Sequence, residues 1–139
     1  MQRYLDDRMR ANLQHKPHGN VVQWLSGFDD AHLFISAMTV AEIQAGIELT
    51  RAQDAQKAQE TERWLDKIAA TLNVLPLDTA VMRTWARLMH GTSDLVWEDA
   101  MIAAVAKVHG LTVATRNLRD FKAFGVPLVD PFTAAASPT

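Results

Sequence analysis

Four acidic residues, spaced widely along the chain, have the chemistry needed to hold a hard metal ion: Asp6, Glu42, Asp99 and Asp120. Hard divalent cations prefer oxygen ligands, and Mg²⁺ usually keeps several waters beside a few carboxylates. Such an ion polarises a phosphate oxygen and lowers the pKa of a bound water. The chain has no cysteine and no pair of histidines at ligand spacing, so this set indicates Mg²⁺ or Mn²⁺ rather than zinc.

The hydrophobic pattern predicts the elements that gather these carboxylates. Short apolar runs predict strands at 4–5, 32–36, 73–77, 111–114 and 126–129, and apolar spacings of three and four predict helices at 20–28, 39–50, 54–72, 78–90, 97–109 and 117–122. Alternating strands and helices predict an α/β fold with a mainly parallel sheet covered by helices on both faces. The carboxyl ends of parallel strands share one edge, where ligands bind, and all four carboxylates are expected there.

Local signals sharpen several boundaries of these elements. Pro76 places the 73–77 strand near an edge of the sheet, because proline cannot donate to a central ladder. Asp78 is expected to cap the helix that follows it, and Gly110 to end the 97–109 helix.

Each carboxylate also has a purely structural interpretation. Thr39 and Glu42 have the spacing of a capping box, in which the glutamate satisfies backbone donors. Asp99 lies near a predicted helix start, where the helix dipole favours an acid. Asp120 has the position of a local cap after Asn117, and Asp6 that of a turn residue. Only the joint pattern of all four favours a functional site.

Length and composition predict one soluble domain. The chain has 139 residues, 48% of them hydrophobic; we expect a domain over 1–132 and a disordered tail over 133–139. No apolar run spans a bilayer and no signal peptide is recognisable, so we expect a cytoplasmic protein with no membrane role. The net charge of −2 argues mildly against binding nucleic acid by charge alone.

Two motifs resemble those of a known family. Asp99–Ala106 followed by Leu111–Phe121 looks like the C-terminal half of PIN-domain toxins of the VapC type. Ser36–Gly46 resembles their second acidic motif. The resemblance runs from about Tyr4 to Phe132 and is nearest to the VapC/FitB-like branch.

The resemblance implies a fold, an activity and partners. It implies a PIN-like parallel sheet of about five strands, an acidic pocket that binds Mg²⁺ or Mn²⁺, and hydrolysis of RNA, often tRNA or ribosomal RNA. A small antitoxin would block the pocket, the toxin would dimerise, and DNA would be bound only indirectly through the antitoxin. By position, Asp6, Glu42 and Asp99 match the three central carboxylates, Asp120 the fourth, and Thr115 and Asn117 the polar residues beside it.

The neighbouring basic residues have two interpretations. Arg116, Arg119 and Lys122 lie beside the expected pocket, where they would hold RNA phosphates. Basic residues on a short helix are more often plain solvated surface.

The chain departs from the family at its first acidic motif. The family usually has Leu-Asp-Thr-Asn where this chain has Leu5-Asp6-Asp7-Arg8. Asp7 would replace Asp6 as a ligand if the register slips by one residue, and Arg8 would weaken metal binding if it pairs with a site carboxylate. One alternative function is therefore a PIN domain with weakened catalysis that acts through antitoxin and operator. A generic phosphatase or nucleotide-binding domain is disfavoured, since no glycine-rich phosphate loop follows any predicted strand.

Overall fold

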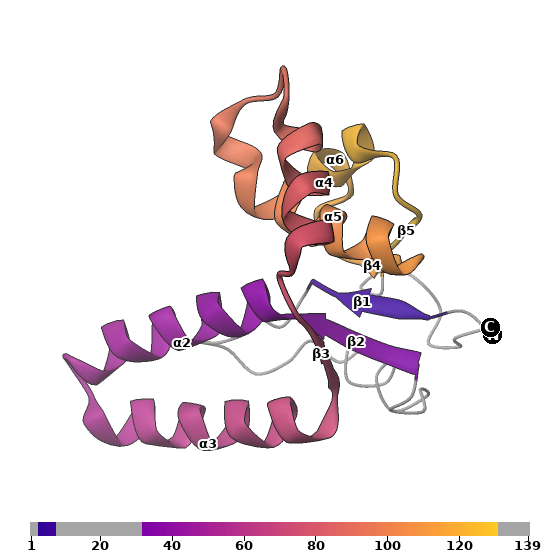
Figure 1. Ribbon diagram of the computed structural model, residues 1–139. Helices are drawn as coiled ribbons and strands as arrows, with labels where there is room; N and C mark the ends of the chain where they lie inside the picture. The colour runs from indigo at the N-terminus through magenta and orange to yellow at the C-terminus, as the bar shows by residue number, and fades with distance from the viewer. Residues whose placement is uncertain (1–2, 8–31, 131–139) are drawn as a thin grey trace.

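The computed structural model describes residues 3–7 and 32–130, and within them five parallel strands form a sheet of order β3-β2-β1-β4-β5 (Figure 1). The strands are β1 Tyr4–Asp6, β2 Leu33–Ser36, β3 Asn73–Leu75, β4 Thr112–Ala114 and β5 Leu128–Val129. The predicted α/β fold with a parallel sheet of about five strands is confirmed.

The helices connect these strands and cover the sheet. In the described part of the chain they are α2 Ala37–Arg51, α3 Ala55–Thr71, α4 Thr79–Met89, α5 Trp97–His109 and α6 Leu118–Phe121, with the 3₁₀ helices η3 Asp94–Val96 and η4 Lys122–Phe124. None of the helices within 3–7 and 32–130 is both long and apolar enough to cross a membrane. The helix predicted at 20–28 and the tail predicted at 133–139 lie outside the described residues.

Two predicted boundaries are confirmed by local geometry. The Asp78 carboxylate accepts a hydrogen bond from the Val81 backbone N–H at 3.0 Å and so caps α4. Gly110 ends α5 with a φ of 66°, a left-handed conformation that glycine adopts without a Cβ clash. Strand β3 lies at the edge of the sheet, as predicted, and ends at Leu75 because Pro76 follows it.

The capping box predicted at the start of α2 is wrong. The helix begins at Ala37, and its cap is Ser36, whose hydroxyl accepts a hydrogen bond from the Met38 N–H at 3.0 Å. Thr39 is buried inside the helix instead of capping it, and Glu42 lies in the second turn. A capping role therefore no longer accounts for Glu42.

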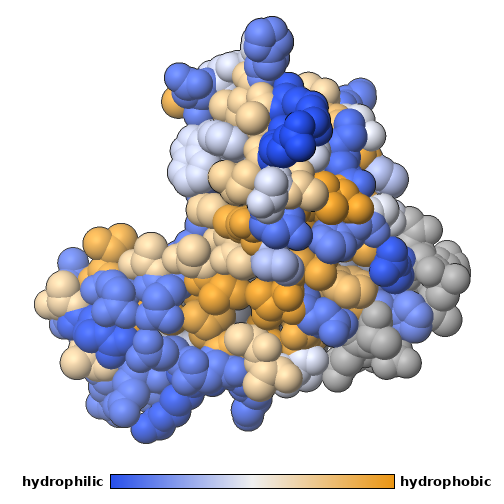
Figure 2. All heavy atoms as spheres, in the orientation of Figure 1, coloured by the Kyte–Doolittle hydropathy of each residue, from blue (hydrophilic) through white to orange (hydrophobic). Residues whose placement is uncertain are grey.

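Two groups of apolar side chains attach the helices to opposite faces of the sheet. Leu5 and Val113 belong to a cluster with the buried Ala100–Ala106 stretch of α5, whereas Ile35 belongs to a cluster with Ile43 and Ile47 of α2. Successive side chains of a strand point to opposite faces, so α4 and α5 cover one face and α2 and α3 the other. Figure 1 shows α2 and α3 extending from the sheet as a pair, and Figure 2 shows apolar side chains gathered between them.

A polar network joins α2 to α3 on the exposed side of this pair. The Arg51 guanidinium donates to Glu48 at 3.0 Å and to Glu62 at 2.8 Å. The Gln44 amide donates to the same two carboxylates, at 2.7 and 2.8 Å. The pKa of Glu48 is lowered chiefly by the Arg51 hydrogen bond, and that of Glu62 chiefly by the Gln44 hydrogen bond and then by Arg51.

The network makes a small part of the stability depend on pH. Because the folded pKa values of Glu48 and Glu62 are lowered, their contribution is present above the ordinary value of 4.5 and is lost as pH falls through the folded values. We expect Arg51→Gln to lower the melting temperature slightly at neutral pH, since exposed ion pairs contribute little. The difference from the wild type should vanish in strong acid. Lys57→Gln, an equal charge change at an exposed position of α3, should not show this pH-dependent difference.

Candidate functional site

The sheet changes its direction of winding between β1 and β4. The chain runs from β1 outward to β2 and β3, and β4 then forms on the other side of β1. In open parallel sheets, ligands bind in the crevice outside the carboxyl ends of the strands at such a switch point. Asp7 directly follows β1 and Thr115 directly follows β4, so polar residues lie where this rule places a ligand.

Hydrogen bonds join the ends of these two strands. The Asp7 backbone N–H donates to the Ala114 carbonyl at 2.9 Å, which continues the pairing of β1 with β4. The Thr115 hydroxyl donates to the Asp7 Oδ2 at 2.7 Å and its oxygen accepts the Asn117 backbone N–H at 3.0 Å. A threonine and an aspartate from distant parts of the sequence are thereby held in fixed orientations.

The same contacts continue to two further carboxylates. The Asn117 Nδ2 donates to the Asp120 Oδ2 at 2.8 Å, and it makes a longer contact of 3.5 Å with the Asp99 Oδ2. We call Asp7, Thr115, Asn117, Asp99 and Asp120 the polar chain. It brings three of the protein's acidic side chains to one region through the side chains of Thr115 and Asn117.

The polar chain runs from the interior to the surface. Thr115, Asp7 and Asp99 are 1%, 5% and 9% exposed, whereas Asn117 is exposed and Asp120 half-buried. Buried polar groups are usually hydrogen-bonded, and the Thr115 hydroxyl meets this need for the Oδ2 atom of Asp7. Asp99 also lies in the first turn of α5, a position where acidic side chains are favourable. The outer end is open to a solute.

Asp6 and Asp7 face opposite sides of the sheet. Leu5 packs with the α5 cluster, whereas Tyr4 belongs to a separate cluster with Leu33 and Ala114. Alternation along the strand puts Asp6 on the side of Tyr4 and Asp7 on the side of Leu5, where α5 and Asp99 lie. Asp7, which the sequence left as the alternative to Asp6, is therefore the carboxylate that follows β1 on the α5 side.

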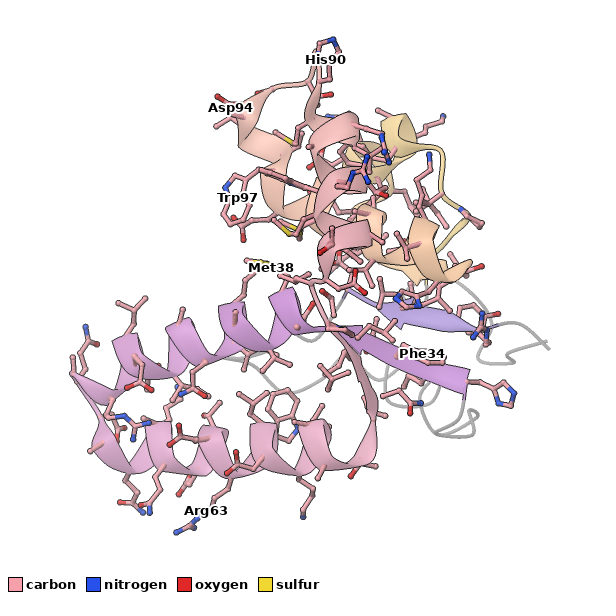
Figure 3. The ribbon with its side chains drawn as sticks, viewed as in Figure 1. Phe34, Met38, Arg63, His90, Asp94 and Trp97 are labelled. Carbon is pink, nitrogen blue, oxygen red and sulfur yellow. The ribbon has the colours of Figure 1, made fainter. Side chains whose placement is uncertain are left out.

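Glu42 reaches the same side of the molecule from α2. It lies one helical turn after Met38, and Met38 packs against the α4–α5 cluster. Residues four apart share a helix face, so Glu42, which is half-buried, is on the side of α2 that faces α4 and α5. Figure 3 shows Met38 on this side, toward the part of the molecule that carries Trp97.

The carboxylates are not gathered into a ready-made metal cluster. Within residues 3–7 and 32–130, no three or more acidic, histidine or cysteine side chains are grouped so that they could hold one ion. Of the four ligands expected from the sequence, Asp99 and Asp120 both contact the Asn117 amide. The pair fits Mg²⁺, which commonly binds one or two carboxylates and completes its shell with waters and phosphate oxygens.

Basic side chains flank the outer end of the polar chain. Arg116 and Arg119 are exposed on either side of Asn117 in the sequence. One arginine guanidinium can donate two parallel hydrogen bonds to the oxygens of a phosphate. Their placement is compatible with the phosphate contacts predicted from the sequence.

The fold and the site together define an α/β domain with carboxylates at the switch point of a parallel sheet. Residues 10–126 match the PIN domain, and the chain belongs to the PIN-domain family. The match begins after Asp6 and Asp7, so the choice between these two residues depends on their geometry.

Relatives of known name agree with this family. The chain is 32% identical to toxin FitB of Neisseria gonorrhoeae over 128 residues, which cover 86% of this chain and 90% of that protein. It is 32% identical to the VapC ribonuclease Y4jK of Sinorhizobium fredii over 125 residues, 86% of this chain and 89% of that one. The crystal structure of FitAcB from Neisseria gonorrhoeae superposes with a TM-score of 0.81 at 30% identity, covering 94% and 99% of the two chains. The resemblance seen in the sequence motifs is confirmed.

Proposed function

We propose that this protein is the toxin of a toxin–antitoxin pair and an endoribonuclease that depends on Mg²⁺ or Mn²⁺. The observation that carries the proposal is the polar chain, which brings Asp7, Asp99 and Asp120 to the switch point of the sheet. Membership of the PIN-domain family and the similarity to a VapC ribonuclease support RNA as the substrate.

In this proposal, the carboxylates bind a cation, and the cation also offsets the negative charge of the RNA backbone. Asp99 and Asp120 would bind the ion, which would supply charge stabilisation at the phosphate and acidity to a water. Without a cation, these carboxylates repel a phosphodiester, and a chain of net charge −2 has little general attraction for RNA. Arg116 and Arg119 would add local attraction for the phosphates next to the site.

The remaining residues have orienting roles. Asp7 keeps one orientation because the Thr115 hydroxyl donates to it at 2.7 Å. We assign to Asp7 the placement of the attacking water on the α5 side of the sheet. Glu42 lies on the side of α2 that faces α5, and it would add a further carboxylate to the site.

The central test is RNA cleavage with and without a divalent cation. Purified protein is incubated with total tRNA in Mg²⁺, in Mn²⁺ and in EDTA, and the ends of the products are mapped. We expect defined cleavage with either cation, loss of cleavage in EDTA, and recovery when excess Mg²⁺ is returned. Equal cleavage in EDTA would contradict the proposed metal dependence.

A second function is a PIN domain with weakened catalysis that works mainly through its partners. It is favoured by the absence of a three-ligand cluster among residues 3–7 and 32–130. Titration with Mn²⁺ separates the two functions, because a protein that binds the ion in its folded state is stabilised by it. No Mn²⁺-dependent rise in melting temperature, together with no RNA cleavage, would favour the second function.

The proposal includes the partners that membership of this family suggests. They are a small antitoxin protein that covers the site, a second copy of the chain, and operator DNA reached through the antitoxin. The activity would take place in the cytoplasm, where RNA is present.

A further inference from the structure

We propose that Asn117 is the residue that positions Asp99 and Asp120 for the cation, and that its side chain is not an RNA contact. This inference rests on the proposed function. An amide nitrogen carries two N–H groups, so Asn117 can donate to both carboxylates at once. Its Nδ2 lies 2.8 Å from the Asp120 Oδ2 and 3.5 Å from the Asp99 Oδ2, so the donors are already directed at protein groups.

The backbone of Asn117 is itself fixed by a hydrogen bond. Its backbone N–H donates to the Thr115 hydroxyl oxygen at 3.0 Å, and that hydroxyl donates to the buried Asp7. The backbone of Asn117 is therefore linked to the ends of β4 and β1 through Thr115 and Asp7. Its side-chain amide contacts Asp99 of α5 and Asp120 of α6. This arrangement places the amide between a carboxylate that is 9% exposed and one that is half-buried.

A neutral donor is the suitable residue type for this task. Two carboxylates held near each other repel, and hydrogen bonds to the charged forms offset that repulsion before a cation arrives. A lysine here would compete with the cation, and an aspartate would add a third negative charge. An asparagine orients one oxygen of each carboxylate and adds no charge of its own. Groups that orient metal ligands in this way typically change metal affinity by about 10–100-fold when they are replaced.

The test measures Mn²⁺ binding directly, by the loss of the free-ion signal in electron paramagnetic resonance, using the full chain. We expect Asn117→Ala to weaken Mn²⁺ binding by roughly tenfold or more. Cleavage should then need more Mn²⁺ for half-maximal rate, while KM for RNA at saturating Mn²⁺ changes little. Leu118→Ala, at the neighbouring position, which is 38% exposed, should bind Mn²⁺ as the wild type does.

Asn117→Asp provides a second variant of nearly the same shape. Its added charge should lower the melting temperature without metal and increase the rise in melting temperature on adding Mn²⁺. This pattern would separate a positioning role from general damage to the fold, which would reduce both values.

The outcomes distinguish this inference from the proposed function. If Asn117→Ala binds Mn²⁺ as tightly as the wild type but has a raised KM for RNA, Asn117 is an RNA contact and the inference fails while the nuclease proposal stands. If the wild type neither binds Mn²⁺ nor cleaves RNA, both fail. Weakened Mn²⁺ binding in Asn117→Ala with normal binding in Leu118→Ala supports the inference.

Discussion

Replacing Asp99 by asparagine is expected to abolish the Mg²⁺-dependent cleavage of RNA while the protein stays folded. Asp99 is 9% exposed, lies in the first turn of α5 and shares the Asn117 amide with Asp120. Removing its charge takes away half of the carboxylate pair that would bind the cation. Loss of a single electrostatic stabiliser typically costs roughly 10²–10³-fold in rate, and we expect at least that decrease in kcat.

The fold should tolerate this substitution because asparagine has nearly the same shape as aspartate. Its side-chain oxygen can still accept the hydrogen bond from Asn117. Asp94→Asn is the matched control, since it removes the same charge from an exposed position of η3, which Figure 3 shows at the far end of the helical part. Retained cleavage in Asp99→Asn, with the melting temperature unchanged, would remove Asp99 from the site.

Asp7→Asn is expected to reduce RNA cleavage far more than Asp6→Asn. Asp7 accepts the Thr115 hydroxyl at 2.7 Å and lies on the α5 side of the sheet, whereas alternation puts Asp6 on the other side. We expect a loss on the order of 10²-fold or more for Asp7→Asn, because the substitution removes the carboxylate that would place the attacking water. The measurement is kcat for each variant at saturating Mg²⁺.

Stability must be measured for both variants, since both carboxyl groups are buried. The Thr115 hydroxyl can still donate to an asparagine oxygen, so Asp7→Asn should remain folded. Thr115→Val, which removes the donor, should show a smaller loss of activity than Asp7→Asn. If well-folded Asp6→Asn protein loses more kcat than Asp7→Asn, then Asp6 belongs to the site and the assignment of Asp7 is contradicted.

The sequence alone determined the layers of the fold and several of its helices. Helix α5 spans Trp97–His109 in the structure, as its apolar spacing and Gly110 predict. Local signals of this kind act within a few residues, so a single sequence carries them completely. The start of α2 was missed because Ser36 and Thr39 are both suitable caps, and only the observed hydrogen bond to Met38 selects Ser36.

The tertiary structure alone decided which carboxylates meet. A shift of one residue along a strand moves a side chain to the opposite face of the sheet, so the sequence could not choose between Asp6 and Asp7. The contact between Thr115 and Asp7 joins residues 108 positions apart and exists only because β1 pairs with β4. Residue types can be read along the chain, whereas the distances between them depend on the register of strands that only the folded sheet establishes.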